Sequence, residues 1–379
     1  MKTKISYVLI FLLLFSCKGK EVGQDDIPVF ELSDVFNDKA ETVDLEDICD
    51  NIQVIPLETS DDILINVIAD VEKYRDKLYV KHNNNNKLSV FDLTGKYLYQ
   101  IGSFGQGPGE YTDISDIHFY DDTIYIHDYL QDKVFKYSLE TRGFLGSWKY
   151  DEHITDFHPA GSETLLGFIP NDTGKEVNQW MFYDTNGTCI DSVPPTNHFD
   201  GEIPFSAFFP QEISFYNYSG LPHFKSIFND TVFTVLPNRK FKPLYVLDVG
   251  ENALREEVRW TSTDPSKNLV GDKKTAFIQS ENDRYILLYG YGLKVNSTSA
   301  AYLLIDKKEN ITKKIVIHYN DEMGKLFDQS LRTKKQLEKG KPVFIPFFFS
   351  ADGKTMFTTE TSAANEEDNP IIVMATLKD

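Results

Sequence analysis

The sequence predicts an all-β protein assembled from repeated antiparallel units, and three observations support this prediction. Aromatic residues are abundant, with 28 Phe and 20 Tyr among 379 residues, which favours strands over helices. Short apolar runs alternate with polar turns along most of the chain. Similar segments recur 46 residues apart, because 77–80 (KLYV) aligns with 123–126 (TIYI). A period in the forties with several strands per unit is typical of a β-propeller.

The N-terminal residues are expected to lie outside the repeats. Residues 1–16 combine two lysines with a short apolar run (ISYVLIFLLLFS), as in a secretory signal peptide. The residues before Cys17 resemble a bacterial lipobox, which predicts lipidation of Cys17; an ordinary secreted protein is the alternative. Residues 17–44 are then a lipidated tether and lead-in segment, and residues 45–379 are a single propeller domain.

Six four-stranded antiparallel blades are predicted from the recurring pattern of runs and tight turns. The units start near residues 66, 113, 155, 206, 276 and 343. The run 52–57 (IQVIPL) precedes the first unit, and we expect it to pair with 371–377, because an open ring would expose sheet edges. Residues 320–341 have a helix-forming composition with apolar residues on one face, which predicts an inserted helix.

A glycine-rich stretch, 103–111 (SFGQGPGEY), lies between two predicted strands. A phosphate-binding loop needs a helix after it, whose N-terminal amides meet the anion, and G-x-G-x-x-G spacing; neither is expected here. Gly105, Gly107 and Gly109 are predicted to permit backbone conformations that other residues resist. Pro108 is predicted to stiffen the crossing. The stretch is therefore interpreted as a structural linker between blades.

The negative net charge of the chain makes some classes of binding partner unfavourable. A net charge of −19 repels phosphate backbones, so we expect no nucleic-acid partner, and contact with a membrane through the lipid anchor only. After lipidation two cysteines remain, Cys49 and Cys189. A disulfide between them is compatible with an oxidising compartment, but two cysteines do not make a disulfide framework.

The segment 101–128 (IGSFGQGPGEYTDISDIHFYDDTIYIHD) resembles an NHL-type propeller repeat. From about residue 45 onward, the chain resembles the six-bladed β-propeller lipoproteins of Bacteroidetes, which share an early PLET-like strand (56–59), the GQGPGEY linker and a late DNP (368–370). The resemblance implies an outer-membrane lipoprotein that faces the periplasm or the cell surface. It implies fold and location more than activity.

Four residues are candidate metal ligands. Propellers bind ligands at the mouth of the central channel, and a calcium- or zinc-dependent propeller lactonase or lyase would place ligands at the ends of inner strands. His127 and Asp128 end a run that we expect to be such a strand, and His153 lies close to Asp156. The alternative is a strand-end Asp that caps a turn, with scattered histidines. The cofactor is therefore left open between Ca²⁺ and none.

An aromatic-rich segment, 199–218, is the candidate binding surface. It contains seven aromatic residues, broken by prolines that are expected to prevent a regular strand. Aromatic platforms suit sugar stacking or a protein partner, and an irregular blade that buries its Phe side chains is the alternative. The candidate binding residues are Phe205, Phe208, Phe209, Phe215, Tyr216 and Tyr218.

Two functions remain open from the sequence. The favoured one is a binding module of the cell envelope that recognises a glycan, a peptide or a partner lipoprotein through one propeller face. The other is a metal-dependent propeller hydrolase or lyase with its site at the channel mouth. The sequence contains no H-E-x-x-H and no G-x-S-x-G motif, which favours the binding module over an enzyme.

Overall fold

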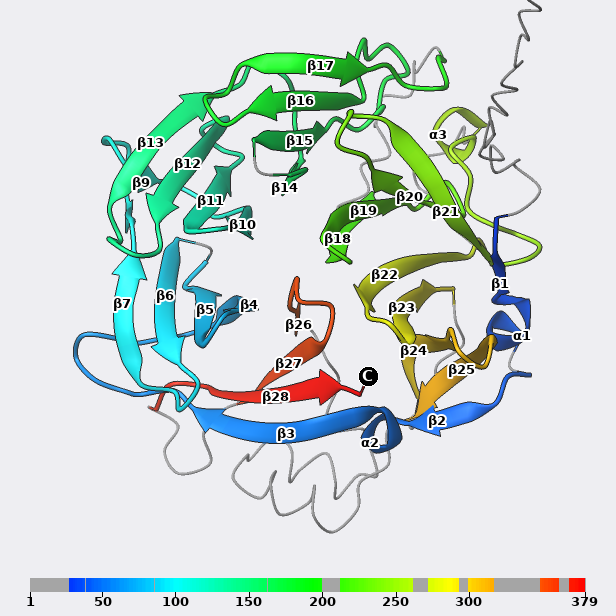
Figure 1. Cartoon of the computed structure of the whole chain (residues 1–379), viewed down its shortest axis with the longest axis horizontal. Coiled ribbons are helices and arrows are strands. Elements are labelled where there is room, and N and C mark those ends of the chain that lie inside the picture. The colour runs from blue at the N-terminus through cyan, green and yellow to red at the C-terminus, as the bar shows by residue number, and fades with distance from the viewer. Residues whose placement is uncertain are drawn as a thin grey trace, which may run out of the picture.

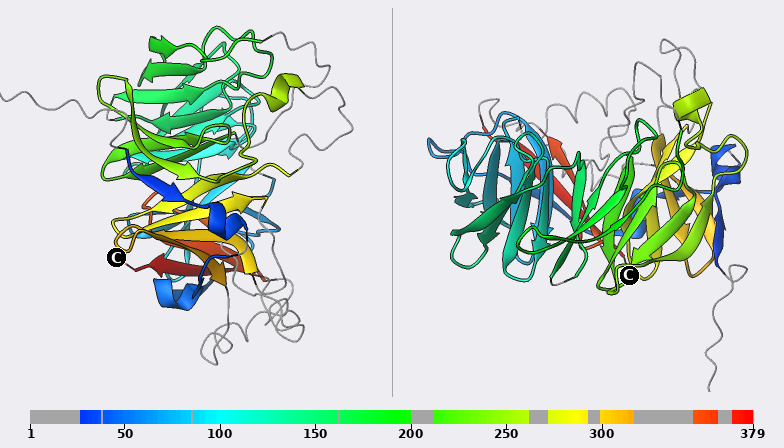
Figure 2. Two further views of the ribbon diagram at one scale, coloured as in Figure 1. Left: turned by 90° about the vertical axis from the view of Figure 1, so that its right-hand side faces the viewer. Right: turned by 90° about the horizontal axis from the view of Figure 1, so that it is seen from above.

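Six antiparallel sheets stand in a ring around a common axis, and each sheet is one propeller blade (Figure 1). The computed structural model describes residues 27–378, apart from 38, 85, 162, 200–211, 262–271, 293–298, 317–347 and 361–367. Seen from the side, the ring is a disc, and the short helix α3 (Val258–Thr261) rises above one of its faces (Figure 2). The predicted six-bladed β-propeller is confirmed.

Blades 1, 2 and 3 are each made from one continuous stretch of chain. Blade 1 contains β4 (Ile68–Tyr74), β5 (Lys77–His82), β6 (Lys87–Asp92) and β7 (Tyr97–Ile101). Blade 2 contains β10 (Asp116–Tyr120), β11 (Thr123–Asp128), β12 (Lys133–Ser138) and β13 (Phe144–Lys149). Blade 3 contains β14 (Asp156–Pro159), β15 (Thr164–Phe168), β16 (Trp180–Asp184) and β17 (Cys189–Val193). The strands of each blade pair in chain order, from the innermost strand to the rim.

Blades 4 and 5 each have a fifth strand that the N-terminal segment supplies. Blade 4 contains β18 (Ile213–Tyr218), β19 (Leu221–Ser226), β20 (Thr231–Val235) and β21 (Phe241–Asp248). Blade 5 contains β22 (Thr275–Glu281), β23 (Tyr285–Tyr291), β24 (Ser299–Asp306) and β25 (Ile311–Val316). Parallel pairing adds β1 (Val29–Glu31) to β21 and β2 (Thr42–Asp44) to β25. Part of the predicted lead-in segment, with α1 (Ser33–Phe36), therefore lies along the rim (Figure 1).

Blade 6 closes the ring by joining the two ends of the propeller. It contains β26 (Phe348–Phe349), β27 (Thr355–Glu360), β28 (Ile371–Leu377) and β3 (Cys49–Pro56), which follows α2 (Leu45–Ile48). The outer strand β3 pairs antiparallel with β28, and Ile55 lies opposite Ile372. The predicted pairing of these two segments is confirmed. Closure satisfies the backbone groups along one side of each strand, which would otherwise be an open sheet edge.

The hydrophobic core lies between neighbouring blades, because both faces of each blade are covered. In β5, successive side chains point to opposite faces. Leu78 and Val80 pack with Phe357 of blade 6, whereas Tyr79 packs with Ile124 of blade 2. This explains why second strands such as β5 and β23 contain several consecutive apolar residues. Each fully buried side chain of this size contributes about 1.5–3 kcal/mol.

The glycine-rich stretch crosses from blade 1 to blade 2. Its ends form a short parallel pair, β8 (Ser103–Phe104) with β9 (Glu110–Tyr111), and strand β10 follows it as expected. The backbone N–H of Gly107 donates to Oε2 of Glu110 at 2.8 Å, so the turn binds its own carboxylate. Gly109 has φ +75°, a conformation that favours glycine.

Some predictions lie outside the described residues, namely the signal peptide, Cys17 and the inserted helix over 320–341. The innermost strands start at 68, 116, 156, 213, 275 and 348, and the largest difference from the predicted unit starts is in the fourth unit. Cys49 is buried and Cys189 is exposed, and both are free thiols. Within the described ranges, no helix is long and apolar enough to cross a membrane.

Candidate ligand-binding channel

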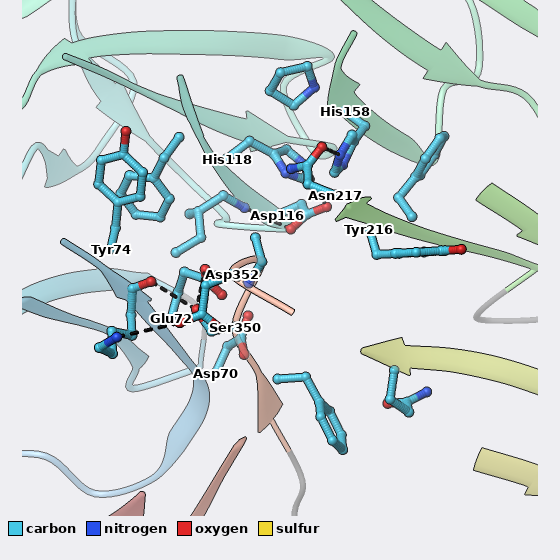
Figure 3. A pocket seen from close by; sticks show the side chains of 18 of the residues that line it. Asp70, Glu72, Tyr74, Asp116, His118, His158, Tyr216, Asn217, Ser350 and Asp352 are labelled. Carbon is cyan, nitrogen blue, oxygen red and sulfur yellow. Dashed lines mark hydrogen bonds and ion pairs between the residues drawn. The ribbon is translucent and has the colours of Figure 1, made fainter. Parts of the chain in front are cut away.

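The innermost strands of the blades surround a cavity of about 520 Å³ at the centre of the ring (Figure 3). A cavity of this size is within the usual range for small-ligand sites. Side chains from all six blades line it, including residues at the end of β4 and in the turn after β26, such as Arg75 and Asp352. The pocket is therefore a channel that opens near the turns that follow the innermost strands.

Blades 1, 2 and 3 form a charged wall of this channel. In each of them the innermost strand carries an acidic residue and, two positions later, a second ionisable residue on the same side of the strand. These six residues are Asp70 and Glu72, Asp116 and His118, and Asp156 and His158. Each of these three blades therefore presents a pair of ionisable side chains in the same arrangement, and together the pairs line about half of the channel.

The acidic groups of blades 1 and 2 have partners within the protein. Burial raises the pKa of Asp70, and Nζ of Lys81 lies 4.0 Å from its carboxylate. Burial raises the pKa of Glu72 well above its ordinary value, although Ser350 donates to it at 3.0 Å. Burial also opposes the charge of Asp116, but the charge of His118, whose Nε2 lies 2.9 Å away, outweighs it and lowers the pKa of Asp116 to about 2.

Asp156 differs from the other two aspartates of this wall. The hydroxyl of Thr155 donates to it at 2.6 Å, and no basic side chain in the described ranges forms an ion pair with it. Burial, with the negative charge of nearby Asp116, raises the pKa of Asp156 to about 6. Two neighbouring carboxyl groups therefore differ in pKa, one held as a carboxylate and one close to accepting a proton.

A row of rings continues the wall into blade 4. His158 meets His118 edge to face, with ring centroids 4.7 Å apart, and stacks on Phe215 at 5.0 Å and 8°. Burial lowers the pKa of His158 to about 3, so the ring is neutral. With Oδ1 of Asn217 3.1 Å from it, Nε2 carries the proton and donates, which leaves Nδ1 as an acceptor. This buried Nδ1 has no hydrogen-bond partner among the described residues.

His127 and Asp128 end β11, the second strand of blade 2, and so they do not lie on the innermost strand that faces the channel. His127 is buried, contacts the hydroxyl of Tyr150 at 2.6 Å, and has its pKa lowered to about 4 by burial. Asp128 accepts from the backbone N–H of Thr112 at 2.6 Å and from that of Gln131 at 3.0 Å. These contacts fix the turn and the linker, as a turn-capping Asp does.

The other two candidate metal ligands, His153 and Asp156, have different surroundings. His153 contacts the hydroxyl of Tyr129 at 3.0 Å, whereas Asp156 lies in the channel. Within the described ranges, no three His, Cys, Asp or Glu side chains come together in a group that could hold a metal ion. No described arrangement of side chains therefore supports the predicted metal ligands, which remain a prediction.

The aromatic segment is partly a regular strand, contrary to expectation. Residues 213–218 form β18, the innermost strand of blade 4. Phe215 and Tyr216 both line the channel, and the hydroxyl of Tyr216 also donates to Oε2 of Glu281 at 2.8 Å. Tyr218 donates to Asp283 at 3.2 Å. The remaining candidates, Phe205, Phe208 and Phe209, lie outside the described residues.

Of the six residues of the charged wall, only Asp156 was predicted from the sequence. The repeat is clearest in the second strands, such as 77–80 and 123–126, whereas the charged wall lies on the first strand of each blade. The same 46-residue offset aligns Asp70 with Asp116, which is the signal that could have found them. His118 and His158 carry no comparable signal, because their roles depend on rings from three different blades.

The ring of sheets and its central pocket define a six-bladed β-propeller with a polar channel. Residues 27–376 match DUF4934, a domain of unknown function, and the chain belongs to this family. A solved structure of a "Putative exported protein" from Bacteroides fragilis is similar, with 18% sequence identity and a TM-score of 0.66. The match covers 89% of this chain and 99% of that chain. At this identity the likeness shows the shared fold.

Two further solved structures are less similar. A DUF4221 family member from Bacteroides vulgatus is 9% identical, with a TM-score of 0.49 over 87% of this chain and 97% of that chain. A streptogramin B lyase is 12% identical, with a TM-score of 0.42 over 86% and 98% of the respective chains. A search of curated protein sequences finds no match.

Proposed function

We propose that the protein is an exported, lipid-anchored binding module of the cell envelope, which takes its ligand into the central channel. The observation that carries the proposal is the composition of the 520 Å³ cavity, where carboxylates, two amides and aromatic rings from different blades share one space. Apolar surfaces with a few polar groups that fix orientation are typical of ligand sites. The signal-like residues 1–16 and the name of the Bacteroides fragilis protein support export.

The volume of the cavity suits a small ligand, or the end of a glycan or peptide chain, better than the flat surface of another protein. A glycan end can stack a sugar ring on Phe215 and donate its hydroxyls to the carboxylates of the wall. A peptide end can use the same groups. The channel mouth therefore fits the glycan or peptide ligands that the sequence left open better than it fits a partner lipoprotein.

The experiment is a screen of glycan and peptide arrays with the full chain in a non-ionic detergent, followed by calorimetric titration of the hits. Phe215→Ala is expected to weaken binding at least tenfold, because it removes the ring that lines the channel. Phe104→Ala is the matched control, since Phe104 is 59% exposed on β8, outside the channel. Hits that bind both variants equally well would place the binding site elsewhere.

The metal-dependent alternative has a separate readout. Metal analysis of the same preparation and thermal melts with and without EDTA test it directly. One equivalent of bound calcium or zinc, with a clear loss of melting temperature on chelation, would favour a hydrolase or lyase over the binding module.

A further inference from the structure

The channel contains an acidic pair whose charge the protein does not balance. Asp116 and Asp156 lie on neighbouring innermost strands, β10 and β14, which pack against each other. The imidazole of His118 is the partner of Asp116 at 2.9 Å. The described contact of Asp156 is a hydroxyl, which is neutral. Two carboxylates that share a desolvated space are stable together when a cation compensates them or when one of them takes up a proton.

The basic side chains near the channel are engaged with other partners. Lys81 lies 4.0 Å from Asp70 and donates to the carbonyl of Ser115 at 3.3 Å. Lys73 lies 3.4 Å from Asp352 at the mouth. The guanidinium of Arg75 donates to a backbone carbonyl of the next blade at 2.8 Å. In the described part of the chain, none of the three forms an ion pair with Asp156.

A second observation on the same wall indicates a ligand that donates hydrogen bonds. His158 is 2% exposed, and its Nδ1 is an acceptor without a partner among the described residues. A buried acceptor that makes no hydrogen bond costs about 1–3 kcal/mol, which a donor from a ligand would recover. Figure 3 shows His158, His118 and Asp116 together on one side of the pocket.

We propose that this part of the channel is a seat for a primary ammonium group of the ligand, held by Asp116, Asp156 and Nδ1 of His158. The inference rests on the proposed function, because it assigns the ligand class of the same channel. An ammonium group has three donors, which match two carboxylates and one neutral acceptor. Its one positive charge balances Asp156, because His118 already balances Asp116. Amino sugars and peptide N-termini both carry this group.

The experiment compares ligands that differ only in this charge. Calorimetric titrations of the full chain in non-ionic detergent use glucosamine against N-acetylglucosamine, and glycylglycine against N-acetylglycylglycine. We expect the free amine of at least one pair to bind at least tenfold more tightly than its acetylated counterpart. The pair that shows the preference identifies the source of the ammonium group.

Three variants test the residues. Asp156→Asn is expected to abolish the preference for the free amine, and Asp156→Glu, which keeps the charge, to retain part of it. Asp191→Asn is the matched control, because Asp191 pairs with Arg239 at 3.0 Å on the exposed strand β17 of the same blade. Melting curves of each variant show whether it is folded before it is titrated.

The outcomes separate this inference from the proposed function. Equal binding of both members of each pair, no detectable binding of any of the four compounds, or an unchanged preference in Asp156→Asn would each overturn the ammonium seat. If array ligands without an amine still depend on Phe215, the channel remains the binding site and only the seat is wrong. If calcium chloride alone binds at one equivalent and Asp156→Asn removes it, the seat holds a metal ion, and the ammonium proposal is wrong.

Discussion

The two halves of the propeller differ both in how the chain builds them and in what they present to the channel. Blades 1, 2 and 3 each come from one continuous stretch, and their innermost strands carry the ionisable wall. Blades 4 and 5 are widened by β1 and β2, and blade 6 takes its outer strand from β3. On this side Phe215, Asn217 and Gln279 line the cavity with neutral groups, and the turn after β26 adds one acidic residue, Asp352.

The strands that close the ring and the ionisable side chains that line the channel therefore belong to different halves of the propeller. Contacts between distant parts of the sequence concentrate in the second half, where the N-terminal segment runs along the rim (Figure 1). Most of the ionisable side chains that line the channel lie in the half that is built from local hairpins. The four predictions below test this division, from the largest expected effect to the smallest.

The largest effect is expected at the closure in blade 6. Ile372 is fully buried on β28, faces Ile55 of β3, and packs in the cluster that contains Phe357. Ile372→Ala removes three carbons from a site that cannot collapse freely, so we expect a loss of about 2–5 kcal/mol in the free energy of unfolding. Urea unfolding followed by circular dichroism measures it. Ile190→Ala, at a residue 40% exposed on β17, should change stability by about 0.5 kcal/mol or less.

The next effect is expected at the rim segment of blades 4 and 5. Leu32 is fully buried, packs with Leu247 and Ile305, and donates its N–H to the carbonyl of Asp248 at 2.7 Å. Leu32→Ala should cost about 2 kcal/mol, because a short terminal segment can open locally before the ring unfolds. Hydrogen exchange of β1 should therefore accelerate more than that of β28. Leu98→Ala, on the uncovered outer strand β7, is the control, and an equal loss there would contradict the comparison.

A smaller, pH-dependent effect is expected in the charged wall. The pKa of Asp156 is raised to about 6 by burial and by Asp116, so between about pH 4 and pH 6 the folded protein binds more protons than the unfolded chain. Its stability contribution is therefore present at low pH and is lost as the pH rises through 6. Asp156→Asn should gain about 1–2 kcal/mol relative to wild type from pH 4 to pH 7, after allowance for solvent in the channel.

Paired urea titrations of the two proteins at pH 4, 5, 6 and 7 measure this difference. Groups common to both proteins cancel in the comparison, apart from Asp116 and His118, which interact with the site directly. A difference in unfolding free energy that stays constant with pH would show that Asp156 titrates normally.

The smallest effect is expected in the linker between blades 1 and 2. Gly109 has φ +75°, and a Cβ there would lie 2.9 Å from Cγ of Phe144. Gly109→Ala should destabilise the protein by about 1 kcal/mol, since both backbone and ring must adjust. Gly107→Ala is the matched control, because its Cβ would meet only the flexible carboxylate of Glu110. Thermal melts of both variants compare them, and equal melting temperatures would contradict a conformational role for Gly109.

The repeat pattern of the sequence predicted the six blades because it is a local property. A hairpin needs an apolar run, a turn and a second run, and these lie within about 20 residues in segments such as 116–138. The pairing of β3 with β28 was also predictable, because an open ring would expose two sheet edges. The parallel additions of β1 and β2 had no such signal. Each of these strands has three residues and pairs with the outer strand of a complete blade, so it does not need a long alternation of apolar and polar residues.

The sequence by itself determined the blade number, the order of strands and the place where the ring closes, because strand periodicity and turn residues act over short distances. Only the tertiary structure decided which strand faces the channel. Of the predicted candidates it keeps Asp156 in the channel, and it replaces His127 and Asp128 with Asp116 and His118. It also decided which carboxylate has a charged partner and which does not. Those properties depend on the field and packing of side chains from several blades, which no single repeat contains.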